Sequence, residues 1–477
     1  MYRKKSMKEF KMASLAEQLA KFSLDVRFEE IPPATVSNVK RLVVDALGCA
    51  LGALGCEPAK IAEGLIGPPD PEDRASIIGS GKQTTAAGAA LVNGVLTRYL
   101  DFMDVYWSKD VCHPSENIPV ALALAESANA SGRALIEAIV VGYEAQLRIC
   151  DALPLRALGM HHAAAAGFVV PLIAGKLWRM PADRIAHAAV IGGVRHLTLS
   201  ALSRGRLSMA KAIGYPLSAM ETIFSTRLAA QGMTGPMESL DWMFTDMPGW
   251  KTDRAALDLT LGSYRLDRVS LKRYPVQFEL QAPVELAASL GPIGVGSASE
   301  LAAIERIVVE VLPITRERTA DPAKYKPANR ETADHSLPCC VAMALIDGDL
   351  TVRHMESGRW NAPDVAALMA KVQVEASDEF LRRIPHGRPA AITIYRRGMA
   401  RQRSVQEIPL GDADRPMDDS GIEAKFRGLA EPVLGAPGVD RIMDMVSGLD
   451  RIDDLRKLTQ GLRLPFAGSF STACQTA

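Results

Sequence analysis

The segment from Val92 to Asn117 carries the residue types best suited to acid–base chemistry in this chain of 477 residues. Asp101 and Asp104 stand three residues apart, His113 follows, and Ser115 lies in a polar run that leads into an apolar helical pattern. A helix N-terminus attracts anions because its free N–H groups and its dipole point outward. The segment could therefore supply acid and base groups beside a bound carboxylate. A capped core helix after an ordinary polar loop is an equally weighted alternative.

Other candidates lie further along the chain. His161 and His162 form a pair inside an apolar run, Lys211 has mostly apolar neighbours, and Lys272 and Arg273 are adjacent cations that could face a polycarboxylate. Each has a structural alternative: a buried histidine beside an exposed one, a lysine that extends its charge to solvent, and a solvated basic turn. From these residues alone, the solvated turn is the favoured interpretation for Lys272 and Arg273.

Composition limits the class of protein. Hydrophobic residues make up 48% of the chain and charged residues 23%, which is typical of a globular protein. The 55 basic and 55 acidic residues cancel, so there is no electrostatic signature of nucleic-acid binding. The longest apolar run, from Ala163 to Ala174, is too short to span a bilayer. We therefore expect a soluble, cytoplasmic protein with no membrane or nucleic-acid partner.

Motifs for metals and nucleotides are missing from the sequence. The seven cysteines include no C-x-x-C pair and no ligand spacing, so we expect no metal site and no disulfide framework. No G-x-G-x-x-G or G-x-x-x-x-G-K-[ST] pattern follows a predicted strand. The sequence therefore gives no support for nucleotide binding.

Hydrophobic periodicity changes along the chain. Apolar residues at helical spacing predict helices over Ser14–Phe22, Thr35–Leu54, Ala86–Leu100, Ile118–Ala130 and Gly132–Ala152. Short β-branched alternations predict strands at Arg306–Leu312, Lys371–Glu375 and Ala391–Tyr395, with a helix over Ser336–Asp347 between them. Helical patterning returns in Gly421–Ala430 and Val439–Leu458.

The predicted fold class is therefore mainly α, with a large all-helical domain and a smaller α+β lid domain. We expect residues 14–265 to form the first part of the helical domain, 266–415 the lid, and 416–465 helices that return to the helical domain. A chain of this length needs more than one core. The cleft between two domains is the default place for a ligand.

The motif VNGVLTRYLDFMDVYWSKDVCHPSEN (92–117) resembles the signature of the MmgE/PrpD family, typified by 2-methylcitrate dehydratase. That family also contains cis-aconitate decarboxylases and an iminodisuccinate epimerase. The likeness spans about residues 14–460 through GYEAQLR (142–148), segment 159–177, LSMAK (207–211), GMTGP (232–236), KRYPVQFELQAPVE (272–285) and RETADHSLP (330–338). The resemblance implies a homodimer with no metal or organic cofactor.

The resemblance also implies roles for individual residues. It places catalytic groups at Asp101, His113, His162 and Lys211, and substrate-binding groups at Asp104, Ser115, His161, Lys272 and Arg273. His161 stands where one branch of the family has aspartate. Departures from the family pattern are Met103, Val105, Glu116, Ala210, Glu279 and Cys339. They leave the substrate open.

The leading hypothesis is a cofactor-free lyase that dehydrates a small hydroxy-tricarboxylate such as 2-methylcitrate. A base must take a carbon-bound proton while an acid protonates the leaving hydroxyl, each contributing roughly 10²–10⁴ in rate. Fixed cations would stabilise the negative charge that develops beside the substrate carboxylate. A cis-aconitate-type decarboxylase, an epimerase or racemase of a dicarboxylate, and a non-catalytic carboxylate-binding protein are the alternatives.

Overall fold

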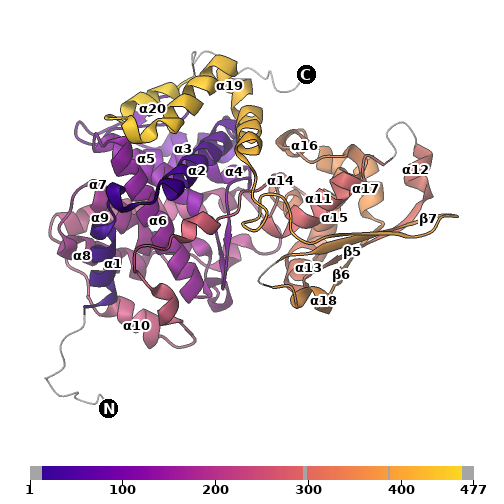
Figure 1. Cartoon of the computed structure of the whole chain (residues 1–477), viewed down its shortest axis with the longest axis horizontal. Helices are drawn as coiled ribbons and strands as arrows, with labels where there is room; N and C mark the ends of the chain where they lie inside the picture. Colours follow the sequence, from indigo (N-terminus) through magenta and orange to yellow (C-terminus); the bar gives the residue numbers. More distant parts are fainter. Residues whose placement is uncertain (1–12, 294–297, 385–386, 465–477) are drawn as a thin grey trace.

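The computed structural model describes residues 13–293, 298–384 and 387–464. It consists of a large helical part and a smaller part that contains a sheet, side by side along the longest axis (Figure 1). The mainly α fold with a smaller α+β part, predicted from the sequence, is confirmed. The last helices return to the large part, where they lie against helices from the beginning of the chain (Figure 1).

The large part contains ten helices within the described residues before the chain leaves it. They are α1 (Leu15–Asp25), α2 (Pro33–Gly52), α3 (Glu57–Leu65), α4 (Ala86–Tyr99), α5 (Asn117–Ser127), α6 (Gly132–Ala152), α7 (Ala166–Leu177), α8 (Ala182–Arg195), α9 (Gly214–Ala230) and α10 (Ser239–Thr245). Side chains of Ser14, Thr85 and Ser131 cap α1, α4 and α6 by accepting free backbone N–H groups. The apolar periodicity thus begins where the sequence supplies a cap.

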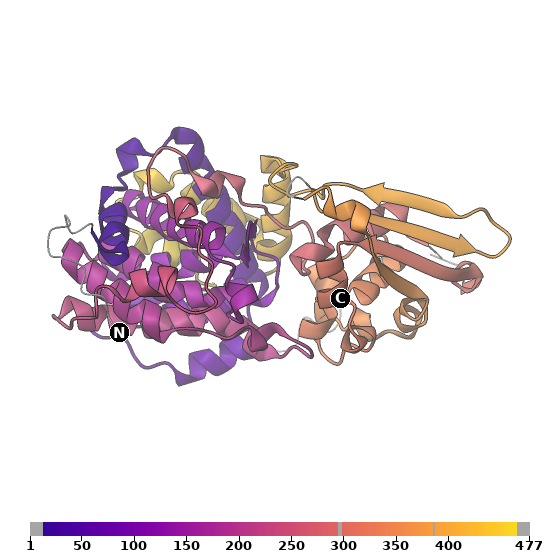
Figure 2. The same cartoon turned by 90° about the horizontal axis from the view of Figure 1, so that it is seen from below.

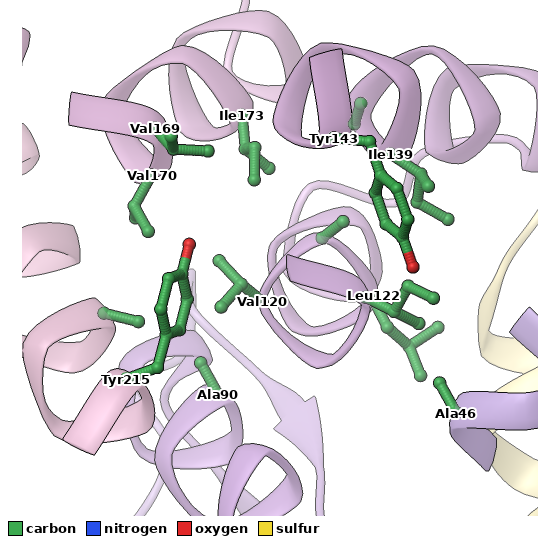
Figure 3. Close-up of a cluster of buried hydrophobic side chains, with 14 of the residues drawn as sticks. Ala46, Ala90, Val120, Leu122, Ile139, Tyr143, Val169, Val170, Ile173 and Tyr215 are labelled. Carbon is green, nitrogen blue, oxygen red and sulfur yellow. The ribbon is translucent and has the colours of Figure 1, made fainter. Parts of the chain in front are cut away.

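Helix α5 lies at the centre of this part and is buried from Asn117 to Glu126. Tyr143 of α6 and Tyr215 of α9 lie on opposite sides of it (Figure 3). Their hydroxyls reach the N-terminal end of α5, where Tyr143 donates to Asp104 and Tyr215 to Asn117. Packing in the core therefore fixes the position of the helix start that the sequence singled out.

Small residues bring helices close together. A Cβ atom on Gly167 of α7 would lie 2.5 Å from the carbonyl oxygen of Gly192 of α8. A Cβ atom on Gly192 would lie 2.3 Å from the carbonyl oxygen of Gly167. Any larger residue at either position would force α7 and α8 apart.

The smaller part is built on a four-stranded sheet in the order β6-β5-β7-β8. Strand β5 (Ile304–Val311) pairs in parallel with β6 (Val372–Ala376) and antiparallel with β7 (Ala390–Arg396), and β7 pairs antiparallel with β8 (Gln402–Gln406). The β7–β8 hairpin extends away from the helical part (Figure 2). The accompanying helices are α11 (Gln281–Leu290), α12 (Ala298–Ala303), α13 (Pro313–Thr319), α14 (Arg330–Ala333), α15 (Leu337–Asp347), α16 (Val352–Glu356), α17 (Pro363–Met369) and α18 (Asp378–Leu381).

The two parts have separate hydrophobic cores. Leu271 belongs to the core of the helical part, whereas Tyr274 belongs to the core of the α+β part. The chain returns to the first core with Met417 and continues into α19 (Asp419–Ser447) and α20 (Arg456–Gly461). Helix α19 packs closely on α2, where Gly48 admits the Phe426 ring. Only two residues separate the two cores at the first crossing.

Most predicted elements are present with shifted ends, and one predicted helix is wrong. The prediction of one helix over Val439–Leu458 is wrong, because α19 ends at Ser447 and the chain turns before α20. Strand β8 was not predicted, because its QRSVQ sequence is polar and mostly exposed and owes its conformation to pairing with β7. Tertiary pairing overrides a weak local pattern there.

Six cysteines in the described chain are free and buried, and Cys474 lies outside the described residues. No single helix of the described chain is both long and apolar enough to cross a membrane. The pair α2 and α3, taken together across a bend of 91°, meets such a test by length and composition only.

Candidate active site

A cavity of about 570 Å³ lies where the two parts meet, and both contribute to its wall. One region is made mainly of deeply buried residues, which we call the buried end: Arg98, Asp101, His113, His161, His162, Lys211 and Lys272, with the partly buried His335. The other region contains the more exposed residues Trp107, Lys109, Arg156 and Arg318 beside the buried Asp110, Phe278 and Glu279, and we call it the rim.

Asp101 is the centre of the buried end. It follows α4 and has a backbone φ of +50°, a conformation that non-glycine residues rarely adopt. Its Oδ1 accepts from Lys272 Nζ at 2.7 Å and from Arg98 at 2.9 Å. Its Oδ2 lies 3.1 Å from Lys211 Nζ and 3.4 Å from His335 Nε2. Asp101 therefore joins side chains that are far apart in the sequence.

The charges around Asp101 determine its ionisation. Burial alone would raise the pKa of Asp101, but Lys211, Lys272 and Arg98 hold it well below its usual value. Burial lowers the pKa of Lys272, against the opposing effect of Asp101. Among the residues that line the buried end, three fixed cations face this one ionised carboxylate. The excess of positive charge suits an anionic ligand.

Asp334 and His335, from the turn between α14 and α15, extend the ionic cluster. Lys211 Nζ lies 3.0 Å from Asp334 Oδ2 and 3.4 Å from His335 Nδ1. Ligand atoms of Asp101, Asp334 and His335 come within 4.8 Å of one another, as in a metal site. The Lys211 ammonium lies among them, however, so a fixed positive charge already occupies the region that a metal ion would need. These residues are better suited to holding the Lys211 ammonium than a metal ion.

His113 is held in one tautomer. It follows β4 (Val111–Cys112), which forms a hairpin with β3 (Tyr106–Trp107). Its Nδ1–H donates to the backbone carbonyl of Asp104 at 2.7 Å, so Nε2 carries the lone pair. Burial, with Arg98 and Lys272 nearby, keeps the pKa of His113 well below its usual value. His113 is thus a neutral imidazole with an available base nitrogen.

His162 is paired with a second buried acid. Its Nε2 lies 3.0 Å from Glu116 Oε2, and its Nδ1 has no hydrogen-bond partner within the described chain. Burial raises the pKa of Glu116 to about 8 and lowers that of His162. The His113 and His162 rings meet edge to face with centroids 5.2 Å apart. Two neutral imidazoles therefore lie together at the buried end.

His161 also lines the buried end, with its ring centroid 4.1 Å from that of His162. Its Nδ1 accepts the backbone N–H of Ala163 at 3.3 Å, so it caps the turn that leads into α7. Burial lowers the pKa of His161 as well.

Three residues expected to bind substrate lie elsewhere. Asp104 accepts from the backbone N–H of Ser115 and from the Tyr143 hydroxyl, both at 2.9 Å, and lies outside the cavity wall beside Ser115. Burial raises the pKa of Asp104 to about 7. Arg273 is exposed and stacks on the ring of Tyr274. Asp104 and Ser115 therefore support the wall from behind, and Arg273 points away from it.

Each charged side chain of the rim has a partner of opposite charge, and Lys109 finds its partner outside the cavity wall, in Asp253 at 2.8 Å. Glu279 accepts from Arg318 at 3.0 Å, and Asp110 lies 3.4 Å from Arg156. Burial would raise the pKa of Glu279, but Arg318 and Arg156 hold it below its usual value. Trp107 and Phe278 add an aromatic surface, with ring centroids 6.0 Å apart. The rim therefore has no excess charge comparable with that of the buried end.

Four residues of the site were not among the predicted ones: Arg98, Glu116, Asp334 and His335. Arg98 stands one helical turn before Asp101, and Glu116 stands at the start of α5, so helical spacing offered a signal for both. Asp334 and His335 lie in the motif RETADHSLP, which contributes to the family resemblance. Only the tertiary structure brings that motif against Lys211.

Two family domains and several known proteins match this chain along most of its length. The MmgE/PrpD N-terminal domain matches residues 17–247, and the MmgE/PrpD C-terminal domain matches residues 274–451. A cis-aconitate decarboxylase of Homo sapiens is 23% identical and covers 98% of both chains. A 2-methylcitrate dehydratase of Cupriavidus necator is 26% identical, covering 72% of this chain and 74% of its own. A cis-aconitate decarboxylase of Aspergillus terreus is 24% identical, covering 95% and 96%.

These relatives support an enzyme of the lyase type, and at such identities they leave the exact reaction open. The first domain match covers the helical part up to α10, and the second begins at Tyr274, where the second core begins. The N-terminal and C-terminal family domains match the two parts of the chain in that order. The chain belongs to the MmgE/PrpD family.

Proposed function

We propose that the protein is a lyase that dehydrates a small hydroxy-tricarboxylate, such as 2-methylcitrate, to an alkene of the cis-aconitate type. One observation carries the proposal: two neutral imidazoles and three fixed cations share the buried end of one cavity. Cations there would bind the substrate carboxylates. Imidazoles would move the two protons that dehydration requires.

Lys211, Lys272 and Arg98 are the proposed carboxylate-binding groups. Removal of a proton next to a carboxylate builds negative charge on that carboxylate, and a preorganised cation stabilises it. Asp101 keeps Lys211 and Lys272 in place, since both ammonium groups lie within 3.1 Å of its carboxylate. No metal or organic cofactor is part of this proposal.

His113 is the proposed base, because its Nε2 lone pair is free while Nδ1–H is engaged by Asp104. His162 is the proposed acid, and Glu116 supplies its proton. When Glu116 is protonated it donates to His162 Nε2, which places the imidazole proton on Nδ1. His113 then takes the carbon-bound proton, His162 protonates the leaving hydroxyl, and water departs as the double bond forms.

Decarboxylation of a cis-aconitate-type acid is the second candidate. The relatives named cis-aconitate decarboxylase match 95% and 98% of this chain, whereas the cited 2-methylcitrate dehydratase matches 72%. The same cations would hold the carboxylates, and one imidazole would protonate the carbanion that remains when carbon dioxide departs. The two reactions differ in which bond breaks, and the site chemistry serves either.

The test is a substrate panel on one preparation: citrate, both 2-methylcitrate diastereomers, cis-aconitate and hydroxy-diacids. A rise in alkene absorbance with release of water supports the dehydratase, and release of carbon dioxide supports the decarboxylase. Exchange of a carbon-bound proton with deuterium, without net conversion, would instead support an epimerase. Thermal stabilisation of the protein by these acids, without conversion or exchange, would support a non-catalytic carboxylate-binding protein.

Two further properties of the proposal can be checked on the same preparation. A chelator should leave turnover unchanged, and loss of activity would contradict a cofactor-free lyase. The homodimer suggested by the family resemblance is tested by light scattering, where a monomer mass would overturn it.

A further inference from the structure

Lys425 of α19 is a partly buried residue whose side chain, 6% exposed, reaches the backbone of the active site. Its Nζ lies 2.6 Å from Asp45 Oδ1 of α2 and donates to the carbonyl oxygens of Phe102 at 2.7 Å and Lys272 at 3.0 Å. It also lies 3.9 Å from the centroid of the Phe102 ring. Lys425 thus combines an ion pair to Asp45 with hydrogen bonds to two backbone carbonyl groups.

Together with the contacts of Lys272, these hydrogen bonds form a ring of interactions around Asp101. Lys272 Nζ donates to the backbone carbonyl of Asp101 at 2.8 Å and to its carboxylate at 2.7 Å. Lys425 holds the next carbonyl, that of Phe102, and the carbonyl of Lys272 itself. The segment at Asp101 and the segment at Lys272 are therefore linked twice, once by each lysine.

The position of this ring explains why such a link is needed. Asp101 has a left-handed backbone conformation that requires support from its surroundings. Lys272 lies at the crossing between the two cores, next to Leu271 of one and near Tyr274 of the other. Asp45 and Lys425 both come from helices of the helical part. Lys425 thus ties the crossing point to a rigid pair of packed helices.

We infer that Lys425, paired with Asp45, is a positioning residue that sets the Asp101 carboxylate and the Lys272 ammonium in place without contacting the substrate. The expected effect of Lys425 on catalysis rests on the proposed function. The effect of Lys425 on the backbone does not, because its hydrogen bonds to the carbonyl groups of Phe102 and Lys272 are independent of the substrate.

Lys425→Met removes the ammonium group and keeps an apolar stem. We expect kcat/KM to fall by about 10- to 100-fold and amide hydrogen exchange to become faster in the peptides that contain Asp101 and Lys272. The matched control is Lys40→Met, since Lys40 Nζ also joins α2 to the end of α19, through the Ser447 carbonyl at 2.7 Å, but away from the cavity. The control should keep the parent kcat/KM and the parent exchange at both peptides.

The inference is overturned if folded Lys425→Met exchanges like the parent at both peptides, or if Lys40→Met shows the same losses. If Lys425→Met does not fold, the Asp45→Asn variant tests the inference in its place, because the amide fills the same space while the charge is lost. It should lower kcat/KM at least threefold and speed up the same exchange, and parent-like values in both would also overturn the inference. If the parent converts no acid in the panel, the proposed lyase fails, and the exchange experiment alone judges the positioning role.

Discussion

The two ends of the cavity use the same kinds of side chain with different connections. At the buried end, Asp101 contacts Lys211, Lys272, Arg98 and His335, and Lys211 in turn contacts Asp334. At the rim, each described carboxylate has one principal cation, as in the pair of Glu279 and Arg318. A network with excess positive charge can receive an anion, whereas isolated pairs are already neutral. Chemistry should therefore depend on the buried end and selectivity on the rim.

Replacing His113 is the strongest test of that contrast. His113→Ala removes the proposed base, so we expect kcat to fall about 10²- to 10⁴-fold. Steady-state kinetics on the substrate found by the panel measures the loss. His187→Ala is the control, because that histidine accepts the backbone N–H of Gly235 and lies away from the cavity. Turnover that survives in His113→Ala would remove this residue from the chemistry.

Lys272→Met should come next in size. A hydrogen bond to a charged group contributes about 1.5–3 kcal/mol, so loss of one carboxylate contact should raise KM roughly 10- to 100-fold. The variant also leaves buried Asp101 with one cation fewer, and unfolding free energy should fall by about 3 kcal/mol. Kinetics and chemical denaturation measure the two effects.

Lys176→Met is a suitable control for that variant, since Lys176 is a largely buried lysine that pairs with Glu137 far from the cavity. It should lose stability and keep its KM. An unchanged KM in Lys272→Met would argue against carboxylate binding by this ammonium.

The contrast between the ends also shows what the sequence could predict. Helices such as α2, α4 and α6 follow from apolar periodicity, and the start of α5 follows from a run of local polar residues. Asp334 and His335 could not be placed from local spacing, because they reach Lys211 only when the α+β part folds against the helical part. A sequence pattern therefore predicts interactions between residues that are close in the sequence. It does not predict contacts between distant segments that meet only in the folded protein.

Glu116 gives the buried end a pH dependence. Its folded pKa, raised to about 8, exceeds its unfolded value, so its contribution to stability is present at low pH and is lost as pH rises through 8. Protonated Glu116 is also the proposed source of the acid proton on His162. We therefore expect kcat to decline several-fold above pH 8. For Glu116→Gln we expect a pH–rate profile in which kcat does not decline above pH 8. The same decline in the variant would mean that another group titrates.

Glu279→Gln should have a smaller effect, since it disturbs a pair at the rim. The amide keeps the shape but weakens the contact with Arg318, which lies 3.0 Å away. We expect kcat/KM for the best substrate to change less than tenfold, while the order of preference among substrates shifts. A full panel on parent and variant measures this. A loss as large as that of His113→Ala would show that the two ends are not functionally distinct.

Arg273→Ala should have the smallest effect, although Arg273 was expected to bind substrate beside Lys272. The two neighbours point in different directions: Lys272 is buried against Asp101, whereas the exposed Arg273 guanidinium lies 5.2 Å from the centroid of the Tyr274 ring. An exposed contact of this kind contributes about 0.5–1 kcal/mol to stability. We expect kcat and KM within twofold of the parent. A tenfold rise in KM would mean that the backbone after Lys272 turns when substrate binds, so that both cations of the pair reach the carboxylates.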